Sequence, residues 1–148
     1  IFLNKKSDDN QILINNKKSI DLSNLNILIV DDDIKNIYIL DSALKEFKAN
    51  VITSFNGAEA IEKLKNDKSI NFILMDIMMP VMNGYEAIEE IKKDNQLKDI
   101  PIIAVTAKAM SGDREKCLNV GADDYISKPI DLNILGSLIK AWSDKKNI

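Results

Sequence analysis

Short apolar runs alternate with longer amphipathic stretches along this chain, and this alternation limits the folds that are open to it. Residues 27–30 and 72–75 are continuously apolar, which is typical of strands that are buried on both faces. Between such runs, as in residues 34–47, apolar side chains recur at helical spacing. Repeated strand–helix units predict an α/β fold with a parallel sheet and helices on both faces. Right-handed crossovers then favour a flavodoxin-like, doubly wound, five-stranded sheet in the order 2-1-3-4-5.

The same spacing predicts where the individual elements lie. Gly121 is a suitable residue to follow the fourth helix, and Asp131 is a suitable N-cap for the fifth. The expected strands cover residues 27–30, 51–53, 72–75, 102–105 and 124–126. The expected helices cover about residues 34–47, 58–65, 84–93, 111–119 and 131–142.

The N-terminal segment has a different composition from the rest. Residues 1–24 are rich in Asn, Lys, Ser and Asp, and their one apolar patch is residues 12–14. We interpret residues 1–24 as a polar linker or tail and residues 25–148 as the folded domain. Because the chain begins at Ile1, we expect it to be a piece of a longer protein.

The overall composition is that of a soluble globular domain. Of the 148 residues, 45% are apolar and 29% are charged. The 20 basic and 23 acidic residues give a net charge of −3, which argues against a domain that holds nucleic acid directly. No apolar run approaches the roughly 20 residues of a membrane span, and no signal-peptide pattern is present. The single cysteine excludes an intramolecular disulfide. We therefore expect a cytoplasmic protein with no membrane segment in these residues.

Acidic residues follow two of the apolar runs. Asp76 closes the run 72–75, and the acidic run 31–33 follows the first expected strand. In the expected sheet order, the crevice lies at the carboxyl ends of strands 1 and 3. These ends carry Asp31, Asp32 and Asp76, so the three carboxylates meet there. Like charges in one crevice repel each other unless a cation is present. Because the chain has no histidine, oxygen ligands favour Mg²⁺, Mn²⁺ or Ca²⁺ over zinc. The alternative for residues 31–33 alone is a solvated acidic turn.

Two later residues are expected at the same edge of the sheet. Thr106 follows the strand 102–105, and its hydroxyl either donates to a phosphoryl oxygen or serves only in packing or a turn. Lys128 follows the last strand, where it either neutralises phosphoryl charge or faces solvent. The next residue, Pro129, restricts the backbone that carries the lysine. Together with the carboxylates, these groups favour phosphoryl chemistry assisted by a divalent cation.

Several sequence strings point to a family. The strings ILIVDDD, LMDIMMPVMNG, PIIAVTA and GADDYISKPI resemble the response regulator receiver domain of two-component signalling. The resemblance covers about residues 25–143, and its one small departure is Asn83, where Asp is frequent. The strings MDIMMPVMNGYEAI and TAKAMSGDREKCLNVGADDYISKPID are similar to receivers carried by hybrid sensor histidine kinases. The resemblance therefore implies that this chain is a fragment of such a kinase.

The resemblance also implies a role for each residue of the site. Asp76 would be the phosphoacceptor, and Lys128 would bind the phosphoryl group. Asp32 and Asp76 would bind Mg²⁺ directly, and Asp31 would act largely through water. The backbone carbonyl of Met78 would be the third protein ligand of the ion.

Two further residues would form a conformational switch. By resemblance, Thr106 matches the switch hydroxyl and Tyr125 matches the aromatic residue that changes rotamer. Read alone, Tyr125 is equally compatible with a half-buried strand residue whose hydroxyl is in water. The implied readout surface is helix 4, strand 5 and helix 5, roughly residues 109–141, where a downstream or intramolecular partner would bind.

The implied reaction is transfer of a phosphoryl group from a phosphohistidine to Asp76. Because the chain has no histidine, the donor lies on another domain or protein, either a histidine kinase or a histidine phosphotransfer domain. The domain would not be an ordinary enzyme, although it would assist its own phosphorylation and dephosphorylation. Met78, two residues past Asp76, is bulky and cannot position water, which predicts slow hydrolysis.

The sequence is also compatible with two other functions. Asp31-x-Asp33 after an apolar strand resembles the nucleophile pair of haloacid-dehalogenase-type phosphatases. That family needs a further acidic pair after its lysine, whereas Asp131 and Asp144 stand far apart, and it leaves Asp76 unexplained. The other possibility is a binding module of the same fold that works without phosphorylation.

Overall fold

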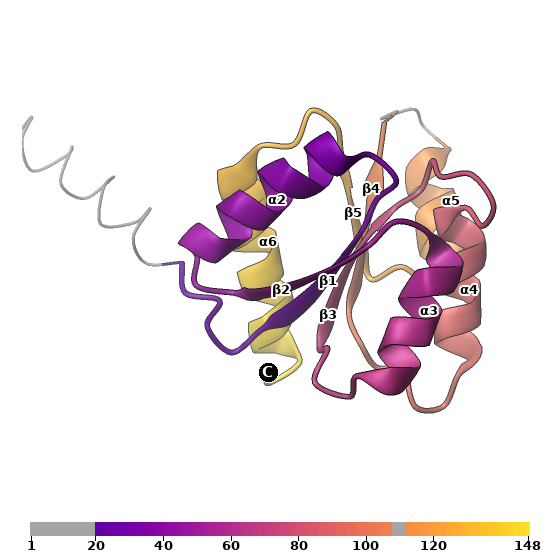
Figure 1. Ribbon diagram of the computed structural model, residues 1–148, viewed down its shortest axis with the longest axis horizontal. Helices are drawn as coiled ribbons and strands as arrows, with labels where there is room; N and C mark the ends of the chain where they lie inside the picture. Colours follow the sequence, from indigo (N-terminus) through magenta and orange to yellow (C-terminus); the bar gives the residue numbers. More distant parts are fainter. Residues whose placement is uncertain (1–19, 108–111) are drawn as a thin grey trace, which may run out of the picture.

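Five parallel strands form the sheet at the centre of the protein (Figure 1). The structure is a computed structural model that describes residues 20–107 and 112–148. The strands are β1 (Asn26–Val30), β2 (Asn50–Ser54), β3 (Phe72–Asp76), β4 (Ile102–Thr106) and β5 (Asp124–Ser127). Their order is β2-β1-β3-β4-β5, which confirms the predicted topology. Val30 pairs with Met75, and Asp76 pairs with Val105, so the carboxyl ends of β1, β3 and β4 meet at one edge.

Helices cover both faces of the sheet, as predicted (Figure 1). On one face lie α2 (Ile34–Glu46) and α6 (Leu132–Lys145). On the other face lie α3 (Gly57–Asn66), α4 (Gly84–Lys93) and α5 (Asp113–Asn119). The last helix continues to Lys145, beyond the predicted end near residue 142.

Two buried layers hold the helices against the sheet. Because successive side chains of a strand point to opposite faces, Leu28 and Val30 enter the layer beneath α3 and α4. Ile27 and Ile29 enter the layer beneath α2 and α6. The strands are therefore buried on both faces, which explains why their sequences are continuously apolar.

Four of the helices start directly after a polar residue whose side chain caps the helix N-terminus. The oxygen of each accepts a hydrogen bond from a backbone N–H in the first turn, an arrangement that stabilises a helix by about 1 kcal/mol. At the start of α4, Asn83 accepts from the N–H of Glu86 at 3.0 Å, so asparagine meets the capping requirement where aspartate is frequent. The capping residues are Asp33 for α2, Asn56 for α3, Asn83 for α4 and, as predicted, Asp131 for α6.

Gly121 follows the C-cap of helix α5, as predicted. The φ angle of Gly121 is +112°, a conformation that side chains with a Cβ rarely adopt. The N–H of Ala122 donates to the carbonyl of Cys117, and the N–H of Gly121 donates to that of Leu118, which together form a Schellman motif. A Cβ on Gly121 would also lie 2.7 Å from Cγ of Lys92.

The first described residues already pack against the domain. Leu22 and Leu25 are buried in the layer beneath α2 and α6, and the N–H of Leu22 donates to the carbonyl of Phe47. Residues 1–19, which include most of the predicted linker and its apolar patch at 12–14, lie outside the described part of the chain. Of the helices in the described part, none is both long and apolar enough to cross a membrane.

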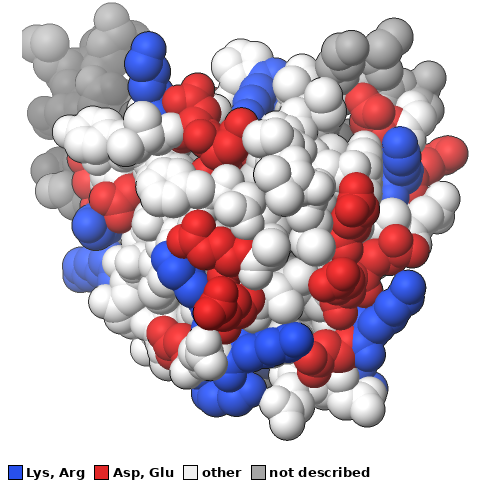
Figure 2. Space-filling view, turned by 45° about the vertical axis from the view of Figure 1, so that its right-hand side comes forward, with Lys and Arg blue, Asp and Glu red and all other residues white. Residues whose placement is uncertain are grey.

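On the face shown in Figure 2, acidic side chains gather in clusters on either side of a largely uncharged centre, and basic side chains lie beside them. Three acidic residues of α4, Glu86, Glu89 and Glu90, are exposed. Ion pairs within helices, such as Lys63 with Glu59 on α3, balance part of this charge. Exposed pairs of this kind contribute at most about 0.5 kcal/mol each, so they affect surface charge more than stability.

Candidate functional site

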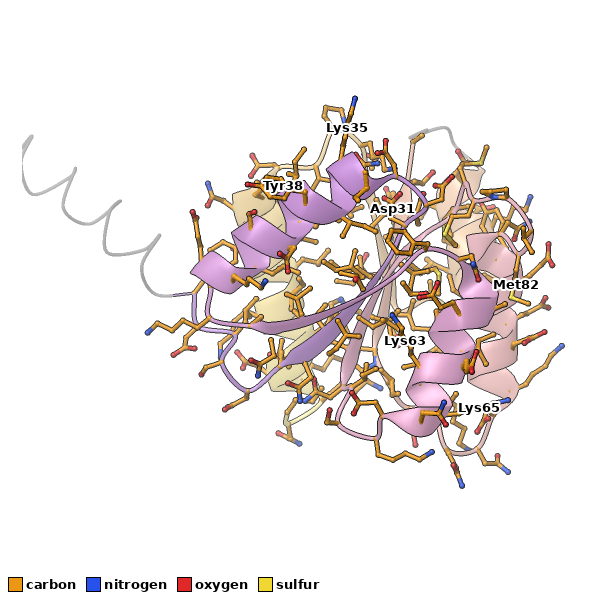
Figure 3. The ribbon with its side chains drawn as sticks, in the orientation of Figure 1. Asp31, Lys35, Tyr38, Lys63, Lys65 and Met82 are labelled. Carbon is orange, nitrogen blue, oxygen red and sulfur yellow. The ribbon has the colours of Figure 1, made fainter. Side chains whose placement is uncertain are left out.

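Three carboxylates meet at the carboxyl ends of β1 and β3. Asp31 follows β1, Asp32 is the next residue, and Asp76 ends β3; one oxygen of each lies within 4.8 Å of the others. Asp31 is 2% exposed and Asp76 is 3% exposed, whereas Asp32 faces solvent. Figure 3 shows Asp31 at this edge of the sheet, beside the start of α2. The structure thus brings together the acidic residues that the sequence placed at two strand ends.

Local hydrogen bonds give Asp31 and Asp33 different structural roles. The N–H of Asp31 donates to the carbonyl of Ser54 at 3.1 Å, which ties the end of β1 to β2. Oδ1 of Asp31 accepts from the N–H of Asp33 at 2.9 Å. Oδ1 of Asp33 accepts in turn from the N–H of Lys35 and caps α2. Asp33 is therefore engaged at the helix start rather than in the group of three carboxylates.

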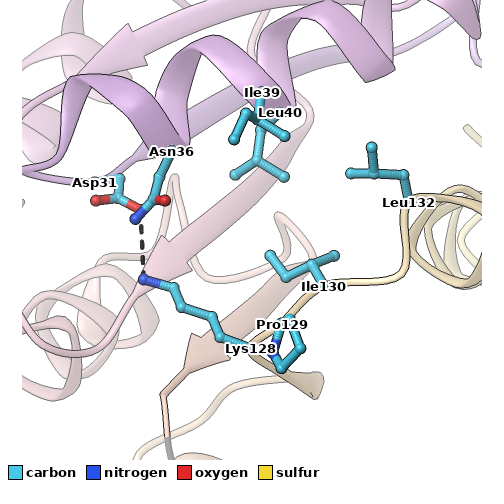
Figure 4. A pocket seen from close by; sticks show the side chains of 8 residues that line it. All are labelled: Asp31, Asn36, Ile39, Leu40, Lys128, Pro129, Ile130 and Leu132. Atoms are coloured by element: carbon cyan, nitrogen blue, oxygen red, sulfur yellow. Dashed lines mark ion pairs between the residues drawn. The ribbon is translucent and has the colours of Figure 1, made fainter.

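Lys128 supplies a positive charge to the group. Its Nζ lies 3.8 Å from Oδ2 of Asp31, the pair drawn in Figure 4, and 3.6 Å from Oδ1 of Asp76. Its backbone N–H donates to the carbonyl of Thr106 at 2.7 Å. The peptide bond between Lys128 and Pro129 is cis. The bond to Thr106 anchors the base of the lysine side chain at the sheet edge, so the ammonium group reaches both buried carboxylates.

The carboxyl group of Asp76 is unfavourably placed for a negative charge. Burial raises its pKa to about 6, and the negative charges of Asp31 and, to a smaller extent, Asp32 add to the rise. Lys128 and the N–H of Met78, which donates to Oδ1 at 3.2 Å, lower the pKa. One ammonium group does not balance three carboxylates. A divalent cation with oxygen ligands would relieve their repulsion, and the clustered carboxylates fit Mg²⁺ or Mn²⁺.

Thr106 and Tyr125 lie on the same face of neighbouring strands. Thr106 ends β4 and is buried, and it pairs with Ser127 of β5. Tyr125 pairs with Ala104, so the two-residue period of strands puts Thr106 and Tyr125 on one face. Tyr125 is half-buried against the layer beneath α3 and α4. The two predicted switch residues therefore share the sheet face that α5 covers.

A hollow of about 280 Å³ opens beside Asp31 and Lys128, between α2 and the segment that joins β5 to α6 (Figure 4). The sequence patterns did not predict the apolar residues that line this hollow. The available signal was Ile39 of α2, a large apolar residue away from the core-facing positions, and it is exposed. The lining residues are Asp31, Asn36, Ile39, Leu40, Lys128, Pro129, Ile130 and Leu132.

The three carboxylates and Lys128 lie in a part of the chain that matches a known protein family. The family model described as the response regulator receiver domain matches residues 27–140. This chain belongs to the response regulator receiver domain family. The matched range of the receiver includes every candidate site residue, from Asp31 to Lys128. The predicted family, and with it the assignment to two-component phosphorelay signalling, is confirmed.

Three similar proteins illustrate the relationship. Hybrid signal transduction histidine kinase M of Dictyostelium discoideum is 38% identical over 118 residues, which cover 77% of this chain and 5% of that kinase. The receiver domain of sensor histidine kinase PA1611 from Pseudomonas aeruginosa PAO1, solved with magnesium in its active site cleft, is 34% identical with a TM-score of 0.74, covering 80% of this chain and 96% of that one. The co-crystal structure of the Saccharomyces cerevisiae phosphotransfer protein Ypd1 with the receiver domain of Ssk1 contains a chain that is 31% identical, with a TM-score of 0.76 and coverages of 84% and 92%. The receiver thus spans only a small part of the curated hybrid kinase.

Neither alternative function is favoured for the receiver. The phosphatase alternative needs Asp33 beside Asp31 in the site, but Asp33 caps α2. It also has no use for Asp76, which lies within the acidic group. A module that works without phosphorylation has no need of a buried carboxylate beside a lysine, yet Asp76 and Lys128 form that pair.

Proposed function

We propose that Asp76 is the phosphoacceptor of this receiver domain and that it takes the phosphoryl group from a phosphohistidine. The main support is the distance of 3.6 Å between Oδ1 of Asp76 and Nζ of Lys128, within a group of three carboxylates. A buried nucleophile beside a cation is the arrangement that phosphoryl transfer needs, because catalysis there consists mainly of positioning and charge stabilisation.

Mg²⁺ or Mn²⁺ is the cofactor that suits this donor set. Asp32 and Asp76 would bind the ion directly, Asp31 would act largely through water, and the carbonyl of Met78 would be the third protein ligand. When bound, such an ion neutralises carboxylate and phosphoryl charge and orients the phosphoryl oxygens. The magnesium ion in the PA1611 receiver supports this choice.

Side chains and one backbone N–H of the receiver itself would carry out and assist the phosphoryl transfer. The carboxylate of Asp76 attacks the phosphorus atom, and a P–O bond forms while the P–N bond to the donor histidine breaks and its electron pair returns to the imidazole. Lys128 stabilises the charge spread over the phosphoryl oxygens as a point cation. The N–H of Met78 holds the Asp76 carboxylate in place through the bond to Oδ1. The domain in this way assists its own phosphorylation.

The aspartyl phosphate would then change the conformation of the receiver. The modified residue carries about −1.5 to −2 units of charge in place of the single negative charge of the carboxylate. The hydroxyl of Thr106 would move toward it and Tyr125 would turn inward, which shifts a pre-existing equilibrium. The readout surface would be α5, β5 and α6, roughly residues 109–141, of which 109–111 lie outside the described residues. A downstream or intramolecular partner would bind there.

The donor would be a histidine kinase or a histidine phosphotransfer domain, and the parent protein a hybrid sensor histidine kinase. The similarity to hybrid kinase M and to the receiver solved with Ypd1 supports both inferences. Residues 1–24 would then link the receiver, residues 25–148, to the preceding part of the parent chain. Because Leu22 packs in the core, the end of this segment would be held against the domain before β1 begins.

Phosphorylation by a small phosphodonor tests the proposal without knowledge of the kinase. The wild type, incubated with acetyl phosphate and Mg²⁺, should gain one phosphoryl group that is labile to acid and base, seen by intact mass. Asp76→Asn should gain none. Asp33→Asn is the matched control, because asparagine also caps helices, and it should be phosphorylated like the wild type. Labile phosphate on Asp76→Asn, or its loss in Asp33→Asn, would contradict the proposal.

A further inference from the structure

Helix α5 carries two cations that stack on tyrosine rings of neighbouring elements. The guanidinium carbon of Arg114 lies 5.8 Å from the ring centroid of Tyr125 on β5. Nζ of Lys116 lies 4.6 Å from the ring centroid of Tyr85 on α4. Both distances fall within the range of about 6 Å over which cation–π attraction is effective. The two contacts therefore attach α5 to its two neighbours.

These contacts are important for the position of α5, because few of its other side chains are buried against the domain. It is seven residues long, and Cys117 is its one buried residue. A helix this short depends on tertiary contacts for its stability. Burial raises the pKa of Tyr85 to about 12, and the neighbouring Cys117 of α5 adds to the rise. Tyr85 therefore contacts α5 through its ring and lies beside the one buried residue of that helix.

Only one of the two tyrosines belongs to the proposed switch. Tyr125 shares its sheet face with Thr106, at the edge that carries the carboxylates. The inward turn proposed for Tyr125 would change the position of its ring relative to Arg114, and with it the stacking contact. The contact of Lys116 with Tyr85 involves α4 and would be unaffected by that turn.

We propose that Arg114 is a positioning residue that holds Tyr125 in its present orientation and so opposes the phosphorylation-dependent change of the receiver. The inference rests on the proposed phosphorylation of Asp76 and on the proposed switch role of Tyr125. Lys116 makes the same type of contact but only anchors α5. An exposed cation–π contact shifts a two-state equilibrium by about two- to fivefold. Because binding and conformation are linked, loss of the Arg114 contact should tighten binding of a phosphoryl analogue by the same factor.

Binding of beryllofluoride in the presence of Mg²⁺ to the 148-residue chain tests this inference. Fluorescence of Trp142, the only tryptophan, provides the signal, since its indole N–H donates to Asp124, the neighbour of Tyr125, at 2.9 Å. Arg114→Gln should bind beryllofluoride about two- to fivefold more tightly than the wild type. Lys116→Gln, the matched control, should bind it with wild-type affinity.

Two further variants separate positioning from a general loss of stability. In a Tyr125→Leu background, Arg114→Gln should no longer change the affinity, because the ring that it contacts is gone. Arg114→Lys, which keeps the cation, should restore wild-type affinity. Equal affinities of Arg114→Gln and wild type, or an equal gain in Lys116→Gln, would overturn the inference. Failure of the wild type to bind beryllofluoride, or binding by Asp76→Asn, would instead overturn the proposed role of Asp76.

Discussion

The ammonium group of Lys128 lies 3.6 Å from Oδ1 of Asp76, although the strands that carry them are not neighbours. β4 stands between β3 and β5, and the lysine side chain reaches across its end. Because Asp76 is buried, salt and solvent screen this pair far less than a surface pair. The charge of Lys128 therefore acts on both the resting carboxylate and the phosphoryl group that it would accept.

Removal of that charge should slow phosphorylation strongly. We expect Lys128→Met to lower the rate with acetyl phosphate and Mg²⁺ by about 100-fold, the usual cost of losing one preorganised stabilising group. Lys45→Met, which removes an exposed lysine paired with Asp41, serves as the control and should leave the rate unchanged. The rates are measured by intact mass over time, and a Lys128→Met rate within a few-fold of wild type would argue against the assigned role.

The raised pKa of Asp76 predicts how stability depends on pH. A carboxyl with a pKa of about 6 in the folded protein and its ordinary value in the unfolded protein favours folding only while protonated. Its contribution is therefore present at low pH and lost as the pH rises through about 6. Without metal, Asp76→Asn should be more stable than wild type at pH 8, by about 1–3 kcal/mol, and the gain should vanish near pH 4.

Urea unfolding at several pH values in the presence of a chelator measures this difference. Added Mg²⁺ should shrink the gain at pH 8, because the ion stabilises the ionised wild type and not the amide. A difference between Asp76→Asn and wild type that stayed constant from pH 4 to pH 8 would show that burial of the charge is not its cause.

Met78 should govern how long the phosphoryl group persists. Its side chain is 69% exposed two residues past Asp76, and a thioether does not position water for attack on phosphorus. Met78→Asn introduces a group that can bind that water, so hydrolysis of the aspartyl phosphate should quicken by up to about tenfold. Met78→Leu keeps an apolar side chain of similar size and should hydrolyse at the wild-type rate. Similar phosphate lifetimes in all three proteins would rule out this role.

Two of the helix ends with positive φ should respond in opposite ways. Lys48 follows α2 with φ of +71°, in the same position that Gly121 holds after α5. Lys48→Gly removes a strained Cβ and should stabilise the protein by about 0.5–1 kcal/mol, whereas Gly121→Ala should destabilise it by about 1–2 kcal/mol. Lys45→Gly, inside α2, is the control and should cost about 1 kcal/mol. Destabilisation by Lys48→Gly in thermal or urea unfolding would contradict this account.

Much of the fold was predictable because its signals are local. Strand and helix follow from the spacing of apolar residues within a few positions, as in 72–75 and 84–93. The topology followed from the handedness of crossovers, and the position of Asp76 at a strand end followed from both. The N-cap at Asp131 and the helix end at Gly121 were equally local. The exact helix ends were less predictable, and α6 continues to Lys145.

The sequence by itself determined the family, the order of the strands and which carboxylates reach the crevice, since these depend on residue type and spacing along the chain. Only the tertiary structure decided that Asp33 caps α2, and that Lys128 lies between Asp31 and Asp76. It alone brought Arg114 over Tyr125. The reason is physical: distance, burial and the pKa of a carboxyl arise from segments far apart in the chain, and they exist only when the sheet is assembled.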